Sequence, residues 1–272
     1  MSKKQIISPP SRFSLVDLRE VYRYRQLLIS LTVRDLKVRY AQTFIGGVWV
    51  ILQPLFTILL LSFVFQKIAG VSTEGVPPFL YILSGYWAWS YFSSVVVGAG
   101  DAIIGAQDMV QKIYFPKLSL PLSKAVSALV DTAIVLVLLA LVMIYYRYPV
   151  TGRTLFFPFA ILATVLCGFA IGTWISAITI RYRDFRFITP FLLQLGLFIT
   201  PIAYPVDQVP EMYQTIYFLN PMVGIIEFCR WSLLSVGTLG PSVIYSAIMI
   251  TVLLVTSILY FGNVEKTMAD II

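Results

Sequence analysis

The sequence predicts an all-α integral membrane protein with six transmembrane helices, an N-terminal cytoplasmic interfacial amphipathic helix and a re-entrant helical pair before the last span. Hydrophobic residues make up 58% of the 272 residues and charged residues only 12%, unlike the composition of a soluble globular domain. Five long stretches carry no charged side chain. These runs are continuous, whereas a closed barrel would show short alternating strands.

Each charge-free run is long enough to cross a hydrocarbon core about 30 Å thick, which takes about 20 helical residues. The runs are Tyr40 to Gln66, Gly75 to Gly100, Thr154 to Ile180, Phe187 to Val206 and Trp231 to Val264. A sixth span is predicted between Leu118 and Tyr146, where only Lys124 and Asp131 interrupt an aliphatic segment. The predicted spans are residues 42–66, 78–100, 118–146, 154–180, 187–204 and 239–263.

The sequence divides into an N-terminal arm (residues 1–40), a transmembrane domain (41–264) and a short C-terminal tail (265–272). From Ser14 to Tyr40, apolar residues recur among arginines and acids, a pattern typical of an amphipathic helix. Such a helix is too polar to cross a membrane and is expected to lie along the cytoplasmic interface. A solvated basic tail is the alternative.

Basic residues set the predicted orientation. Nine of the first 39 residues are lysine or arginine, against three acids, and the positive-inside rule therefore places the N-terminus in the cytoplasm. Six spans return the C-terminus to the same side, where the loops that hold Lys112 and Arg183 also fall. This topology accounts for the net charge of +7, and no nucleic-acid partner is expected.

Several chemical classes are excluded by what the sequence lacks. It contains no histidine, the commonest general base and metal ligand. No lysine follows a glycine, so a phosphate-binding Walker loop is absent. No catalytic residue, bound cofactor or metal is therefore expected in this chain, and any ATPase must be a separate polypeptide.

Two other function classes are weighed against this background. An ion-coupled secondary transporter would need more intramembrane acids and usually an internal repeat. A membrane transferase would depend on Asp101, Asp108 and Asp184, the acids available in the cytoplasmic loops. Asp131 is the acid placed most deeply in a span, with Lys124 seven residues before it on the same helix face. Without a second acid or a histidine to form a relay, a structural ion pair or hydrogen-bond anchor is favoured over proton coupling.

Two aromatic stripes are candidates for a substrate path. The first span carries Trp49, Gln53, Phe56 and Phe63, and the fifth carries Phe187, Phe191, Gln194 and Phe198. Glutamine is costly facing lipid, so these faces should point toward a partner helix or a pore. Core packing is the alternative reading. Leu59 and Leu193 are expected to face lipid, and Tyr86, Trp87, Trp89 and Tyr91 to include interfacial anchors.

Residues 205–238 fit neither a span nor a soluble loop. They contain three prolines and four charged residues around an apolar run that is too short to cross. Two short helices that dip into the outer leaflet and are separated near Asn220-Pro221 are predicted, since irregular backbone at that depth must be buried in protein or line water. Glu227 and Arg230 lie one helical turn apart and could neutralise each other.

Several motifs together resemble the permease subunits of polysaccharide ABC exporters, the ABC-2 group that exports O-antigen, capsular polysaccharide and teichoic acid. In order, they are Leu31 to Tyr40 (LTVRDLKVRY), Gln42-Thr43, Gly46-Gly47, Trp49, Leu52 to Leu55, Lys112 to Lys117 (KIYFPK), Leu120 to Leu122, Arg181 to Asp184 (RYRD), Thr200 to Pro205 (TPIAYP), and Asn220 to Met222 with Glu227 and Arg230. The resemblance covers nearly the whole chain after residue 30.

The resemblance implies a homodimeric six-span permease in the plasma (inner) membrane of a bacterium. It implies two copies of a separate ATP-binding subunit, which would hold ATP and Mg, and a lipid-linked glycan as substrate, with O-antigen the expected polymer. Capsular polysaccharide and teichoic acid remain alternatives, because those permeases share the motifs.

The resemblance also implies roles for two segments. Residues 101–117 would form the coupling segment, with Gln107, Asp108, Lys112 and Tyr114 touching the ATPase. An ordinary interfacial loop is the alternative there. Residues 205–238 would form a gate on the outer face, with Tyr204, Asn220, Glu227 and Arg230 as its candidate residues.

Overall fold

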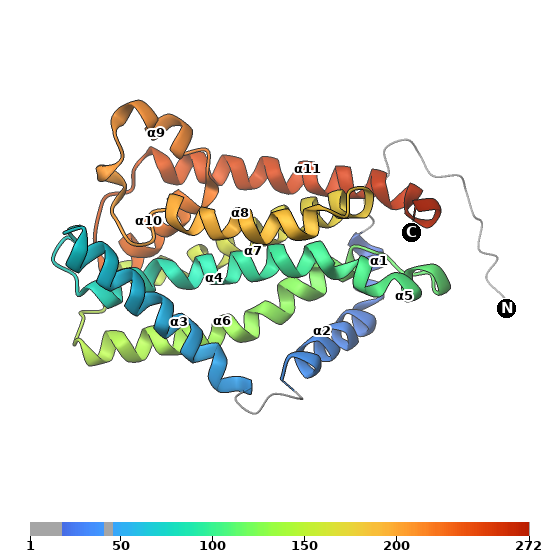
Figure 1. Ribbon diagram of the computed structural model, residues 1–272, viewed down its shortest axis with the longest axis horizontal. Coiled ribbons are helices and arrows are strands. Elements are labelled where there is room, and N and C mark those ends of the chain that lie inside the picture. Colours follow the sequence, from blue (N-terminus) through green and yellow to red (C-terminus); the bar gives the residue numbers. More distant parts are fainter. Residues whose placement is uncertain (1–17, 41–45, 272) are drawn as a thin grey trace.

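The computed structural model describes residues 18–40 and 46–271, and in these ranges every regular element is a helix. Six long helices run alongside one another (Figure 1). They are α3 (Gly46–Ser62), which continues as a π-helical segment (Phe63–Ile68), α4 (Pro78–Ala102), α6 (Ser119–Tyr145), α7 (Phe157–Arg181), α8 (Phe185–Ile199) and α11 (Pro241–Ile271). One long helix therefore occupies each of the six predicted spans.

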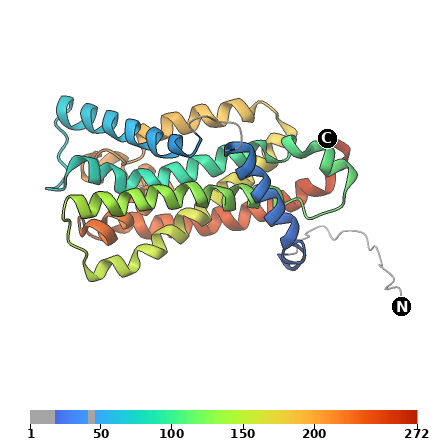
Figure 2. The same cartoon turned by 90° about the horizontal axis from the view of Figure 1, so that it is seen from below.

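Shorter helices lie at the two ends of this bundle. The helices α1 (Leu18–Arg23), α2 (Arg25–Tyr40) and α5 (Gln107–Lys112) lie toward one end, which also holds the C-terminal end of α11 (Figures 1 and 2). The helices α9 (Glu211–Tyr217) and α10 (Pro221–Leu234) lie at the opposite end. Two short helices therefore lie before α11; residues 218–220 separate them, and Pro221 is the first residue of α10.

Within residues 18–40 and 46–271, four helices are long and apolar enough to cross a membrane: Val48–Ile68, Ser119–Tyr145, Gly152–Arg181 and Pro241–Lys266. Helix α4 is 25 residues long but carries many serine, glycine, tyrosine and tryptophan residues. Helix α8 has 15 residues and spans roughly 22 Å at 1.5 Å per residue. It ends before the predicted limit at 204, because Thr200 precedes a proline and takes an extended conformation (φ −80°, ψ 142°).

Helix α4 is the central helix, and it packs against α3, α6, α7, α8 and α10. Its residues from Leu80 to Trp89 are all buried, so it is enclosed on every side. Trp87 and Tyr91 are only 1% and 2% exposed, and the Tyr91 hydroxyl donates to the carbonyl of Ala125 at 3.1 Å. Interfacial anchors were expected among Tyr86, Trp87, Trp89 and Tyr91, but all four are at most 7% exposed, because the surrounding helices cover the middle of α4.

The N-terminal arm differs from the single amphipathic helix predicted for it. A turn at Tyr24 separates α1 from α2, and the predicted start at Ser14 lies outside the described residues. Helix α2 buries Leu31 and Thr32, whereas Val33 and Val38 are 42% and 76% exposed. Its apolar side chains do not share one face, and polar contacts with α6, described below, contribute to its placement.

Candidate functional site

A cavity of about 970 Å³ lies between α3, α4, α6 and α8 and reaches the end of α2. Its polar and aromatic lining residues are Arg39, Tyr40, Trp49, Gln53, Tyr86, Trp89, Ser90, Tyr91, Ser93, Ser94, Asp131, Thr132 and Gln194. Apolar side chains such as Val135 and Leu197 complete the wall. A partly open space with aromatic surfaces and a few convergent hydrogen-bonding groups is typical of a binding site for an organic ligand.

The predicted path residues divide into two groups. Trp49, Gln53 and Gln194 line the cavity. The five phenylalanines do not, and they are 52–77% exposed; they are Phe56, Phe63, Phe187, Phe191 and Phe198. The two stripes therefore turn most of their aromatic rings away from the cavity.

Helix geometry explains this division on α8. At about 100° per residue, the three phenylalanines lie on average about 110° around the helix from Pro190, Leu193 and Leu197, which line the cavity. Gln194 lies at the boundary between the two faces. Leu193, expected to face lipid, instead lines the cavity, while Leu59 is 54% exposed.

Sequence reasoning missed the serines of α4. Ser90, Ser93 and Ser94 line the cavity beside Trp89, and the Ser93 hydroxyl donates to the Ser90 carbonyl at 3.2 Å. Gly196 of α8 faces the same tryptophan, and a Cβ there would come within 2.7 Å of the Trp89 ring. The glycine thus lets α8 approach the aromatic wall of the cavity.

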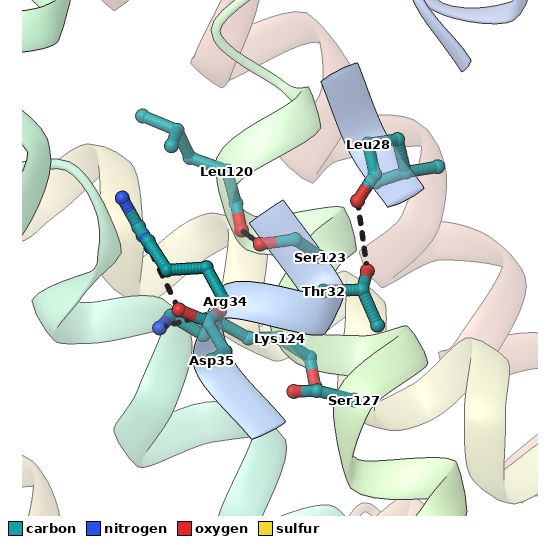
Figure 3. A network of polar contacts seen from close by, with 8 residues as sticks. All are labelled: Leu28, Thr32, Arg34, Asp35, Leu120, Ser123, Lys124 and Ser127. Carbon is teal, nitrogen blue, oxygen red and sulfur yellow. Dashed lines mark hydrogen bonds and ion pairs between the residues drawn. The ribbon is translucent and has the colours of Figure 1, made fainter. Parts of the chain in front are cut away.

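A polar network joins α2 to α6 (Figure 3). The carboxylate of Asp35 lies 2.8 Å from Lys124 Nζ and 3.2 Å from the guanidinium of Arg34. Thr32 is buried beside this pair and donates its hydroxyl to the carbonyl of Leu28 at 2.9 Å. Lys124, expected on the same face as Asp131, thus has its partner on another helix.

Asp131 forms an ion pair with Arg39 and accepts a hydrogen bond from the Tyr40 hydroxyl. The prediction that Asp131 takes part in a structural ion pair is confirmed, with partners from the end of α2. Burial, followed by the hydrogen bond to Asp131, raises the pKa of Tyr40 to about 12. The sequence could have predicted this contact, because Asp35 and Arg39 on α2 have charges opposite to those of Lys124 and Asp131 on α6.

The segment from 101 to 117 contains the short helix α5, which follows a turn of 3-10 helix (Ile104–Ala106). Asp108, Lys112 and Tyr114 are exposed, and Gln107 is half-buried. Although the Tyr114 side chain is largely exposed, partial desolvation of its hydroxyl and the neighbouring Glu20 carboxylate of α1 raise its pKa. The four predicted coupling residues therefore lie together at the end of the bundle that carries α1.

Two further contacts fix this segment. At its beginning, Asp101 lies 2.6 Å from Arg186 in the first turn of α8. At its end, the Lys117 backbone N–H donates to the Glu265 carboxylate of α11 at 3.0 Å. Elements distant in the sequence thus hold both ends of the segment, while the face of α5 that carries Asp108 and Lys112 stays exposed.

At the opposite end of the molecule, Arg230 of α10 is 4% exposed. Its guanidinium donates to the carbonyl of Ile202 at 2.7 Å and that of Tyr204 at 3.3 Å, and lies 3.8 Å from the Tyr81 ring centroid. Glu227 instead accepts a hydrogen bond from Ser242. Glu227 and Arg230 both line a second cavity of about 280 Å³. No direct ion pair joins these two residues, because each has its hydrogen-bond partners on other elements, but their opposite charges interact at this cavity.

The remaining gate candidates link α8 to the short helices. The Tyr204 hydroxyl donates to the carbonyl of Ile199 at 2.6 Å and lies 3.1 Å from the Tyr217 hydroxyl. Asn220 accepts from the Met222 N–H at 3.0 Å and donates to the Thr200 hydroxyl at 3.1 Å. Tyr81 and Ser242 belong to this site as well, and sequence reasoning missed both because their partners are distant in the chain.

Comparison with known proteins identifies relatives along most of the chain. Residues 26–234 match the model of the ABC-2 type transporter family. The O-antigen export system permease protein RfbA of Myxococcus xanthus is 33% identical over 212 residues, which cover 77% of this chain and 80% of that protein. An RfbA of Klebsiella pneumoniae is 26% identical over 90% of this chain and 95% of its own length. The polysialic acid transport protein KpsM of Escherichia coli is 24% identical over 74% of this chain and 78% of its own length.

Proposed function

Because the chain belongs to the ABC-2 type transporter family, we propose that it is the permease subunit of an ATP-driven exporter that carries a lipid-linked polysaccharide out across the plasma membrane. O-antigen is the expected polymer, since two of the relatives are O-antigen export permeases. Capsular polysaccharide is the alternative suggested by the polysialic acid transport relative, and teichoic acid remains a third polymer for the same mechanism.

The single observation that carries this proposal is the chemistry of the large cavity. Sugar rings present C–H faces edged by hydroxyl groups, and aromatic rings with an apolar body contact such faces. Trp49 and Trp89 supply these surfaces, while Gln53, Gln194 and the serines of α4 supply hydrogen-bonding groups. Weak and repeated contacts of this kind suit a polymer that must pass through without being held.

The finer topology is part of the proposal. All six long helices would span the membrane, with α1, α2, α5 and both chain termini in the cytoplasm, and α9 and α10 would form a re-entrant outer gate. The exposed basic residues Arg34, Lys37 and Lys112 on α2 and α5 support this orientation. The short length of α8 is compatible with this topology. The chain after Thr200 continues into the packed outer segment, which would complete the crossing that α8 begins.

The ATPase would be a separate subunit. The sequence has no Walker lysine, and the exposed face of α5 offers Asp108 and Lys112 to a cytoplasmic motor. Two copies of the chain would assemble with two copies of the ATP-binding subunit, which would hold ATP and Mg. Co-purification of such a subunit, with ATP hydrolysis lost when it is removed, is the expected outcome.

The cavity itself is tested by substitution. We expect Trp49→Ala and the double variant Gln53→Ala/Gln194→Ala to reduce export severalfold at unchanged membrane abundance, because they remove ring surface and hydrogen-bonding groups from the path. Surface polysaccharide in a permease-deletion strain, measured by immunoblot, is the readout. Leu59→Ala on the exposed face of α3 serves as the matched control. Normal export in both cavity variants would count against a glycan path through this space.

A further inference from the structure

We infer that Arg39, Tyr40 and Asp131 control access to the large cavity, and that the neighbouring pair Asp35–Lys124 is the fixed point about which the end of α2 moves. All four residues of the two ion pairs come from α2 and α6, the helices joined in Figure 3. This inference concerns entry to the cavity and holds for any substrate that uses it.

The first step of the argument is position. Arg39, Tyr40 and Asp131 belong to the lining of the cavity. The lining of α4 extends to Gly98 and that of α6 begins at Ala128, both at the ends of the lined stretches nearest α5. The polar contact of α2 with Asp131 therefore borders the cavity toward the end of the bundle that carries α1, α2 and α5.

The second step is how the last turn of α2 is held. Farther back, α2 is anchored by the buried side chains of Leu31 and Thr32. In its last turn, Lys37, Val38 and Arg39 are exposed and Tyr40 is only half-buried. This turn lacks the apolar burial that ordinarily fixes a helix, so its contacts with Asp131 hold it in place.

The third step compares the two ion pairs. The side chains of Arg39 and Asp131 are 40% and 20% exposed, whereas those of Lys124 and Asp35 are 23% and 9% exposed. Ion pairs that are more exposed are weaker, because the dielectric constant around them is higher and dissolved salt screens them. The Arg39–Asp131 pair should therefore open first, while Asp35–Lys124 stays closed.

The test measures access to the cavity directly. The full-length permease, with the buried Cys167 and Cys229 replaced by alanine, receives the substitution Ser94→Cys, which places a thiol in the cavity wall on α4. A membrane-impermeant maleimide is applied to each side of sealed vesicles in turn. We expect Arg39→Gln and Asp131→Asn to raise the labelling rate from the α2 side roughly fivefold, the factor expected for an ion pair of ordinary strength.

Three controls separate access from general disturbance. Lys37→Gln removes an exposed charge from the same turn of α2 and should leave the rate within about twofold of the parent. The exchange Arg39→Asp/Asp131→Arg restores an ion pair and should return the rate toward the parent value. Asp35→Asn and Lys124→Gln should lower the melting temperature more than the Arg39 and Asp131 substitutions do, because they loosen the fixed point.

A change in salt concentration tests the inference without any substitution at Arg39 or Asp131. Raising the ionic strength from about 0.1 M to 1 M shortens the screening length from about 10 Å to 3 Å, so labelling of the Ser94→Cys parent should accelerate. The Asp131→Asn variant should show little further change. An unchanged rate in Arg39→Gln and at high salt, or an equal increase in Lys37→Gln, would overturn the inference.

Discussion

At the scale of single residues, the outer site shows why a membrane protein keeps a buried arginine. Arg230 donates hydrogen bonds to the carbonyls of Ile202 and Tyr204, and its guanidinium lies over the ring of Tyr81. Planar guanidinium groups present several donors in a fixed fork, which a lysine cannot reproduce. One side chain on α10 therefore ties together the turn that follows α8 and the start of α4.

Replacing this arginine should loosen the outer segment. In Arg230→Met the length of the side chain is nearly kept, but the carbonyls of Ile202 and Tyr204 lose their donor, at a cost of about 1–3 kcal/mol per unsatisfied buried group. We expect a melting temperature several degrees lower and faster proteolysis between α8 and α10. Arg230→Lys should lie between the parent and Arg230→Met, and the exposed Glu211→Gln on α9 serves as the control. A melting temperature equal to that of the parent would contradict the proposed tie.

Individual residues were predictable where the residue type is costly in a membrane, whereas nearness in sequence did not identify the right partner. The in-span glutamines Gln53 and Gln194 were placed on inward faces, and both line the cavity. The pairing of Glu227 with Arg230 was predicted from their spacing of three, and no direct ion pair between them is observed. The carbonyls that Arg230 uses lie 26 and 28 residues away, and Tyr81 lies in another helix. Contacts to main-chain carbonyls cannot be recognised from residue types, and the serines of α4 form no pattern that would have marked them as cavity residues.

At the scale of elements, α10 and α11 cross in very close contact at Gly224. A Cβ built there would come within 2.4 Å of the Ser242 carbonyl oxygen, and the Gly224 N–H donates to the Ser246 hydroxyl at 3.1 Å. We expect Gly224→Ala to force the two helices apart and to lower the melting temperature by several degrees, because overpacking costs typically 1–3 kcal/mol. Gly152→Ala, where a Cβ meets no atom within 4 Å, is the matched control. Equal stability of the two variants would show that the crossing can relax.

Helix α5 carries a different prediction. Asp108→Lys and Lys112→Glu reverse charges on an exposed face that buries little, so the permease should insert and accumulate normally. If this face contacts the ATPase, each variant should lose most export while ATP hydrolysis continues. Membrane abundance, assembly with the ATP-binding subunit and surface polysaccharide are compared in the same strains. Gln111 is also exposed on α5, so Gln111→Ala tests whether any substitution on this helix abolishes export. Full export by both charge-reversal variants would place the contact with the ATPase elsewhere.

The long elements followed from the sequence because a charge-free run of sufficient length has few other solutions in lipid. Their ends were less certain. The limit of α8 depended on Thr200, whose extended conformation before Pro201 stops the helix earlier than hydropathy alone suggests. The break of the N-terminal arm at Tyr24 could not be predicted, because α2 takes its place from contacts with α6 formed only in the folded molecule.

At the scale of the whole molecule, the exposed aromatic faces of α3 and α8 raise the question of what covers them. Phe56 on α3, Phe63 on the π-helical segment that continues it, and Phe187, Phe191 and Phe198 on α8 are all more than half exposed. Lipid could cover them, but the proposed homodimer offers a second copy of the same faces. A two-fold interface is self-complementary, so a residue near its axis meets its own counterpart.

This symmetry makes a single cysteine sufficient for a test. In the permease with Cys167 and Cys229 replaced by alanine, we expect Phe191→Cys or Phe56→Cys to form a disulfide-linked dimer on mild oxidation in native membranes, because equivalent positions approach across the axis. Val137→Cys, on the exposed face of α6, should remain monomeric and controls for random collision. Native mass spectrometry of the unlinked protein should then give two permease chains with two ATP-binding chains. A monomeric permease, with no cross-link in either Phe56→Cys or Phe191→Cys, would assign both aromatic faces to lipid and remove the homodimer from the proposed exporter.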